Sequence, residues 1–303
     1  MLHKRTLVIA GAILAWGASL EAAISVGYFT DGLDANGNPQ TSDTGLAAPI
    51  ARNGFTAVQI TDIAAFVGAG NLSTIQILLI DEISTGETHD PSAALIGQAP
   101  ALSAWVAGGG VIAIHDRNLC RAQGGTLCTP VPGAAFTPTV LFGADINVDT
   151  TSVTLVTNGP FGPITNATLD GGNFSDLGFV ATLPSGAVGI LNNGTIGQEV
   201  AFSYGFGLGF VYYSTIPLDF FVNVANIANF NPQPIAFRTI YAPNMVAYLA
   251  CLAVPSTCST PPGTGSATGA PTLSQWGLGI LAIMLMGCAA VMLRSGQAKG
   301  PAR

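Results

Sequence analysis

Short apolar runs recur through the first half of the chain, and most of them end at charged or polar residues. The runs cover residues 25–30, 55–60, 75–80 and 111–114. Runs that are apolar on both faces are typical of strands buried in a parallel sheet. Helical stretches at residues 41–52 and 91–107 separate them, and Asp62 is placed to cap a further helix. This alternation predicts an α/β fold with a doubly wound, mainly parallel sheet and right-handed crossovers.

Strands dominate the pattern in the second half of the chain. Strand character is found in residues 144–156, 178–183, 188–192 and 200–213, with turn signals between them. Two helices, residues 218–228 and 238–253, are expected to close the domain. The sequence therefore predicts one α/β domain, residues 24–258, with an additional β-rich second half.

The first 23 residues have the layout of a secretory signal peptide. Lys4 and Arg5 precede an apolar run over residues 7–20, and the small residues Ala22 and Ala23 follow. A basic start, an apolar centre and a small-residue exit are typical of Sec-type export signals. The alternative is an N-terminal anchor that stays uncleaved.

The C-terminal end has three parts after the domain. Residues 259–270 form a linker rich in Gly, Pro, Ser and Thr. Residues 276–293 are apolar and uncharged, which predicts a transmembrane helix. The basic tail, residues 294–303, should stay in the cytoplasm and leave the domain outside the membrane.

A short motif joins the linker to the apolar run. It reads Pro271, Thr272, Leu273, Ser274, Gln275, Trp276 and Gly277. This motif, followed by a helix and a basic tail over residues 271–303, resembles the IPTL-CTERM sorting signal of Gram-negative bacteria, although Ala270 and Gln275 depart from its usual Ile and Glu. The resemblance implies a membrane-anchored precursor, recognised through Pro271 and Trp276 by an exosortase-type protease-transpeptidase and then transferred to the cell surface or extracellular space. The alternatives are a plain anchor helix and a GPI-type signal.

Composition and charge agree with this division of the chain. Hydrophobic residues make up 49% of the sequence, but the two longest apolar runs lie at the ends, so a multi-pass membrane protein is not expected. Residues 24–258 contain 15 acidic residues against four arginines and no lysine, a net charge near −11. Such a domain lacks the basic surface of a nucleic-acid binder.

The cysteines form two closely spaced pairs. Cys120 and Cys128 are eight residues apart, and Cys251 and Cys258 are seven apart. In an exported chain, this spacing predicts two local disulfides. Their spacing relative to the histidines matches no zinc site, and no metal or other cofactor is expected.

Several segments resemble the class I glutamine amidotransferase-like fold in its ThuA-like (trehalose-utilisation) branch. These are residues 26–28, 78–81, 105–115 and 207–215. The resemblance implies a flavodoxin-like or amidotransferase-like sheet over most of residues 24–250. The family's nucleophilic Cys would follow the strand at 111–114, but His115 and Asp116 stand there instead, and no Gly-x-Ser-x-Gly serine motif occurs.

Polar side chains cluster where the predicted parallel strands end. They are Asp31, Asp81, Glu82, His115, Asp116 and Arg117. Ligands of open α/β sheets bind beyond these strand ends. His115 with Asp81 or Asp116 could therefore carry out acid–base catalysis, as in a secreted hydrolase or carbohydrate-acting enzyme. The alternative is that the carboxylates cap turns and that the chain is a non-catalytic surface or extracellular-matrix protein.

Overall fold

A computed structural model describes most of the predicted domain. The described residues are 23–32, 45–82, 91–117, 119, 131–134, 136–170, 175–222 and 235–258. The predicted signal peptide, linker, sorting motif, transmembrane run and basic tail lie outside them, as do Cys120 and Cys128. No helix among the described residues has both the length and the apolar character needed to cross a membrane.

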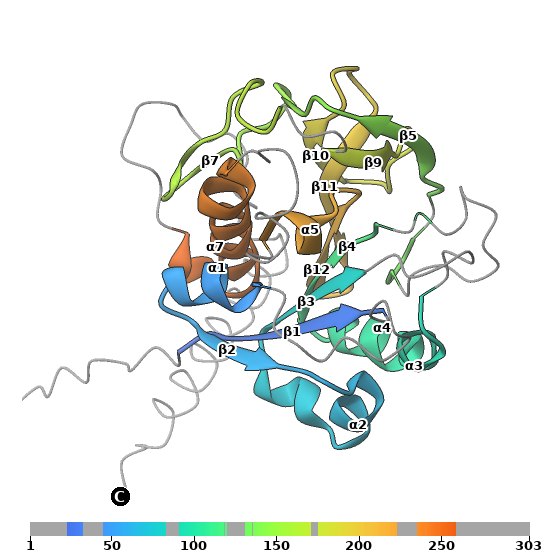
Figure 1. Cartoon of the computed structure of the whole chain (residues 1–303). Helices are drawn as coiled ribbons and strands as arrows, with labels where there is room; N and C mark the ends of the chain where they lie inside the picture. Colours follow the sequence, from blue (N-terminus) through green and yellow to red (C-terminus); the bar gives the residue numbers. More distant parts are fainter. Residues whose placement is uncertain are drawn as a thin grey trace, which may run out of the picture.

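A large mixed sheet forms the centre of the described residues (Figure 1). Its eight strands have the order β2-β1-β3-β4-β12-β11-β10-β6. Their bounds are β1 (Ser25–Asp31), β2 (Thr56–Gln59), β3 (Ile77–Glu82), β4 (Val111–His115), β6 (Asn147–Val148), β10 (Val188–Asn192), β11 (Glu199–Phe206) and β12 (Gly209–Ser214). The first five strands in this order pair in parallel, and the last three pair antiparallel. The prediction of an α/β fold with a large, mainly parallel sheet is confirmed.

Helices cover both faces of this sheet. Their bounds are α1 (Ala47–Arg52), α2 (Ile63–Gly68), η1 (Asn71–Thr74), α3 (Ala93–Gly97), α4 (Ala99–Ala107), α5 (Leu218–Val222), η2 (Phe237–Tyr241), α7 (Ala242–Ala253) and η3 (Pro255–Thr257). In Figure 1, α1 and α7 lie on one face of the sheet, and α2, α3 and α4 lie on the other. The apolar strands β3 and β4 are therefore buried on both sides, as runs without polar alternation require.

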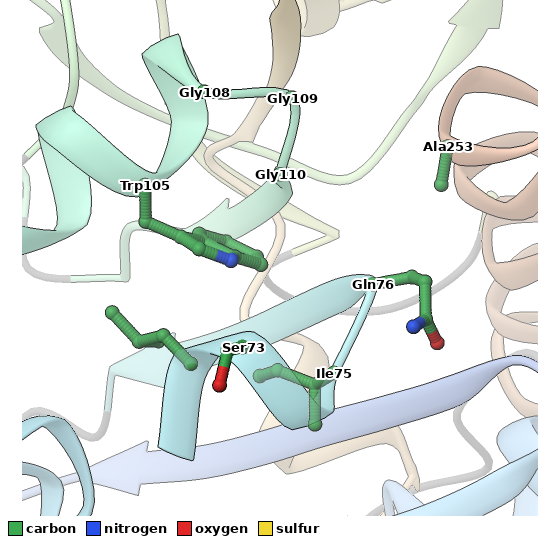
Figure 2. Close-up of a pocket in the computed structure, with 9 residues that line it drawn as sticks. Ser73, Ile75, Gln76, Trp105, Gly108, Gly109, Gly110 and Ala253 are labelled. Carbon is green, nitrogen blue, oxygen red and sulfur yellow. The ribbon is translucent and has the colours of Figure 1, made fainter. Parts of the chain in front are cut away.

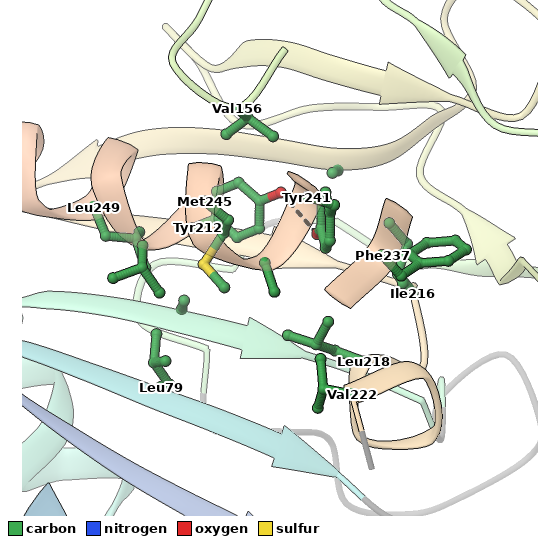
Figure 3. Packing of buried hydrophobic residues seen from close by; sticks show 14 of the residues in the cluster. Leu79, Val156, Tyr212, Ile216, Leu218, Val222, Phe237, Tyr241, Met245 and Leu249 are labelled. Carbon is green, nitrogen blue, oxygen red and sulfur yellow. Dashed lines mark hydrogen bonds between the residues drawn. The ribbon is translucent and has the colours of Figure 1, made fainter. Parts of the chain in front are cut away.

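Two apolar cores result, one on each face. Along β3, Leu79 packs into the core beneath α7, whereas Leu78 packs into the core beneath α4. Figure 3 shows Leu79 facing Met245 and Leu249 of α7. Successive strand residues point to opposite faces, so each strand of this type contributes to both cores.

Two predicted helices are modified by proline. The helix expected at residues 91–107 is divided into α3 and α4, because Pro100 lacks an amide hydrogen and its ring crowds the preceding turn. The helix expected at residues 238–253 begins with the wide π-turn η2, which ends two residues before Pro243.

The predicted helix cap at Asp62 is confirmed. Asp62 Oδ1 accepts the Ala65 amide hydrogen at 2.9 Å, at the start of α2.

The second half differs most from the expected elements. The strand predicted at 144–156 is wrong beyond β6, because residues 149–157 turn back through local hydrogen bonds. The strand predicted at 200–213 is two strands, β11 and β12, which form a hairpin around Gly207. Two further pairs were not expected. They are β5 (Thr139–Gly143) with β9 (Asp176–Phe179), and β7 (Asn158–Gly159) with β8 (Gly162–Pro163).

Candidate functional site

A row of polar side chains crosses the sheet at the carboxyl ends of four parallel strands. Thr30 of β1 is in register with Asp81 of β3, Asp81 with His115 of β4, and His115 with Ser214 of β12. All four share the α7 face, because each lies two residues beyond a member of that core on its own strand. These core members are Tyr28, Leu79, Ala113 and Tyr212. All four are buried. The register therefore places Asp81 and His115 next to each other on neighbouring strands, on the same face of the sheet.

The His115 ring belongs to a buried group of hydroxyls. Its Nε2 atom lies 3.2 Å from the Tyr241 hydroxyl, which lies 3.0 Å from the Tyr212 hydroxyl and 3.4 Å from Ser214 Oγ. Figure 3 shows the contact between Tyr212 and Tyr241. Burial lowers the pKa of His115 to about 3, so the imidazole is neutral near pH 7.

Asp81 differs from the rest of the row in having no hydrogen bond of ordinary geometry, although the Asp219 amide lies close enough to lower its pKa. The residue is 1% exposed, and both carboxyl oxygens are unpartnered. Burial raises the pKa of Asp81 well above its usual range, the Asp219 carboxylate raises it further, and Arg117 opposes this effect. A carboxyl group in this position stays protonated where an exposed aspartate would be ionised.

An ion pair lies beside Asp81. Arg117 Nη1 donates to Asp219 Oδ2 at 2.8 Å, and the guanidinium lies 5.9 Å from the Phe220 ring centroid. Asp219 Oδ1 is buried without a partner. Burial raises the pKa of Asp219, whereas Arg117 lowers it. The pair joins the end of β4 to helix α5.

Asp31 and Asp116 have structural roles. Asp31 Oδ2 accepts the Ser92 amide hydrogen at 2.8 Å and so connects β1 to the start of α3. Asp116 accepts hydrogen bonds from the Leu119 amide and the Tyr213 hydroxyl, at 2.8 and 2.7 Å. Tyr213 belongs to the core under α4, so Asp116 faces away from His115. The structure does not bring His115 and Asp116 together.

This arrangement limits what the row can do chemically. A neutral His115 can accept a proton, but its Nε2 atom already contacts Tyr241. A protonated Asp81 can donate a hydrogen bond to a ligand that reaches it. Within the described ranges, no group of three or more His, Cys, Asp or Glu side chains gathers around one point.

Two cavities lie away from this row. The larger has a volume of about 330 Å³ and lies at the amino ends of β3 and β4. It is lined by Ser73, Gln76, Trp105, Gly108–Gly110 and Ala253, among others (Figure 2). The second, of about 240 Å³, lies between the end of β2 and α2. Neither cavity is predicted by the sequence pattern. Trp105 next to the triple glycine was the available signal for the first.

The structure adds residues that sequence reasoning missed. Tyr212, Ser214, Asp219 and Tyr241 complete the surroundings of His115 and Asp81. No sequence pattern near His115 or Asp81 points to these residues, because they come from strands and helices about 100 or more residues further along the chain. Near the other end of α7, Cys251 and Cys258 form a disulfide.

No protein-family model matches this sequence, and no curated protein matches it either. Among solved structures, the chain is similar to cytoplasmic protein STM3548 from Salmonella typhimurium, with 10% identity and a TM-score of 0.44 over 74% of this chain and 98% of that one. It is also similar to a protein described as ThuA-like from Bacteroides uniformis, with 8% identity and a TM-score of 0.40 over 78% and 95% of the two chains. An exo-beta-1,4-mannosidase from Opitutaceae bacterium strain TAV5 has 14% identity and a TM-score of 0.39 over 75% of this chain and 36% of the enzyme. Similarities at this level of identity and TM-score support no inference about the activity of this chain.

Proposed function

We propose that this chain is an exported protein that is displayed at the cell surface or in the extracellular matrix of a Gram-negative bacterium. We further propose that its α/β domain acts there without catalysing a reaction. In this proposal the N-terminal segment directs export, and the C-terminal segment anchors the precursor for an exosortase-type enzyme.

The Cys251–Cys258 disulfide is the observation that carries the export part of the proposal. It closes the domain directly before the predicted linker. Disulfides persist in oxidising compartments and are rare in the bacterial cytoplasm. The lysine-free, acidic composition of residues 24–258 is also suited to a protein outside the membrane.

The buried state of the polar row supports the non-catalytic part. His115 and Asp81 are each 1% exposed, and the neutral imidazole contacts the Tyr241 hydroxyl. The His115 imidazole and the hydroxyls of Tyr212, Ser214 and Tyr241 form a hydrogen-bonded layer at the carboxyl ends of the strands, which stabilises this part of the sheet. The strand order β2-β1-β3-β4-β12 supports a ThuA-like, amidotransferase-like fold as the frame of this domain.

Deletion of residues 271–277 tests the sorting part in the native host. We expect the deletion variant to remain in the membrane fraction with its C-terminal tail, whereas the intact protein loses the tail and reaches the surface. Intact-mass measurement and surface protease treatment distinguish the two outcomes. Deletion of residues 262–268, which removes seven linker residues and leaves the motif intact, is the matched control. Normal processing of the motif deletion would rule out the sorting proposal.

A second candidate function is hydrolysis, including action on carbohydrates, through His115 and Asp81. One observation favours it, namely the unpartnered Asp81 carboxyl beside His115 at the carboxyl edge of the sheet. The test is a screen of the purified protein with chromogenic glycosides and esters, followed by His115→Asn and Asp81→Asn. A turnover that both variants lose while keeping wild-type circular dichroism would establish this candidate and overturn the non-catalytic one.

A further inference from the structure

Two carboxylates of the second half approach one another far from the polar row. Asp149 follows β6, and Glu199 begins β11. Both carboxyl groups lie over Gly189 of β10, in the space that a side chain at that position would need. Glu199 Oε2 would be 3.0 Å from a β-carbon placed on Gly189, and Asp149 Oδ2 would be closer still.

The Glu199 carboxyl is buried and only partly satisfied. The residue is 3% exposed, and its Oε2 atom has no hydrogen-bond partner. Burial, together with the negative charge of Asp149, raises the pKa of Glu199 to about 7. An unpartnered buried carboxylate oxygen is costly, so a missing partner is expected at this point.

Among the described residues, no salt bridge joins Asp149 or Glu199 to a basic side chain, and Arg52 Nη1 donates to the Thr239 carbonyl instead. The sequence has no lysine between Lys4 and Lys299. Among the described residues, the ion pair formed by Arg117 belongs to Asp219, at the carboxyl edge of the sheet. A proton or a cation from solution would balance the two negative charges at Asp149 and Glu199.

The local backbone holds the two carboxylates in place. The Thr151 amide donates to Asp149 Oδ1 at 2.7 Å, and the Asp149 amide donates to Ile190 O at 3.0 Å. Ser152 Oγ donates to the Gly189 carbonyl, which fixes the 149–152 turn over β10. Asp149 is 7% exposed and Glu199 is 3% exposed, so an ion bound between them would be held largely out of bulk water.

We propose that Asp149 and Glu199 bind a calcium ion over Gly189. The two side chains offer only oxygen ligands, which hard divalent cations prefer, and their two negative charges match the charge of Ca²⁺. Calcium tolerates irregular sites completed by backbone carbonyls and water, whereas Mg²⁺ requires a near-ideal octahedron. With only two carboxylates, the affinity is expected in the weak range of extracellular modules, about 0.1 to 1 mM.

The test is the thermal stability of the purified full-length protein at pH 8, where Glu199 is ionised. We expect 10 mM CaCl₂ to raise Tm by about 3 to 10 °C relative to EDTA, and the same concentration of MgCl₂ to raise it less. The effect should shrink at pH 5.5, because protons then compete for Glu199.

Three variants locate the effect. Glu199→Gln and Asp149→Asn should each remove the calcium-dependent rise in Tm. Asp176→Asn is the matched control, because Asp176 is also a buried, unpartnered carboxyl with a pKa raised to about 7, and it should keep the rise. Calorimetric titration with CaCl₂ provides a second measurement if a variant is unstable. No rise in the wild type, or an equal rise in Glu199→Gln, would overturn the proposal and leave a shared proton as the compensating charge.

Discussion

At the scale of single residues, the face of the strand that a side chain occupies decides its role. His115 and Asp116 are adjacent in sequence, yet one contacts Tyr241 under α7 and the other contacts Tyr213 under α4. A sequence motif of two neighbouring polar residues therefore divides into two separate hydrogen-bond networks. Their residue types were predictable, but their partners were not.

Tyr241→Phe tests the importance of the hydroxyl group at the centre of the row. Its removal leaves the His115 ring and the Tyr212 hydroxyl without their common partner, so we expect a loss of about 1 to 3 kcal/mol in the free energy of unfolding. Urea denaturation measures this loss. Tyr248→Phe is the control, because that hydroxyl has a single side-chain contact, with Ser203 Oγ at 2.7 Å, and the loss should be smaller. Equal losses would contradict a central role for Tyr241.

At the scale of elements, glycine and proline set the boundaries that hydrophobic periodicity missed. The apolar character of residues 200–213 is continuous, so periodicity alone predicts one strand. Gly207 divides it, because its φ of +64° allows the hairpin turn and its missing side chain lets β11 and β12 approach Ala107. Pro100 similarly divides a continuous helical pattern into α3 and α4.

Gly207→Ala tests the tightness of this hairpin. An added β-carbon would lie 2.6 Å from Ala107 Cα and would also strain the backbone, so we expect a loss of about 2 kcal/mol or more. Gly186→Ala is the matched control. Gly186 has a φ of +75° but nothing within 4 Å of the added atom, so only the strain of about 1 kcal/mol remains. Chemical denaturation of both variants separates the contact from the backbone strain.

At the scale of the whole molecule, the disulfide holds the last residues of the domain against α7. Cys251 lies in α7, which packs on the central sheet, and Cys258 is the last described residue before the predicted linker. A bond at this point limits fraying of α7 at the end of the domain. It also makes the stability of the domain depend on the compartment in which the chain folds.

Replacement of both cysteines by serine measures that dependence. Closure of this short loop is worth about 2 kcal/mol, so Cys251→Ser with Cys258→Ser should lower Tm by several degrees. Addition of dithiothreitol should lower the Tm of the wild type by at least as much, because it also reduces the predicted second disulfide, Cys120–Cys128. A further decrease in the double variant would measure the predicted Cys120–Cys128 disulfide, whereas an unchanged Tm after replacement of Cys251 and Cys258 would contradict a stabilising role for the bond at the end of α7.

The sequence by itself determined the buried parallel strands, the polar residues at their ends and the Asp62 cap, because hydrophobic runs and caps depend on residues close together in the chain. It also contained the predicted export and sorting segments, which lie outside the described residues. The tertiary structure decided which distant side chains meet. Strand order brings Ser214 and Tyr241 to His115, and the turn after β6 brings Asp149 to Glu199. Contacts of this range depend on how strands pair and helices pack, which local periodicity does not encode.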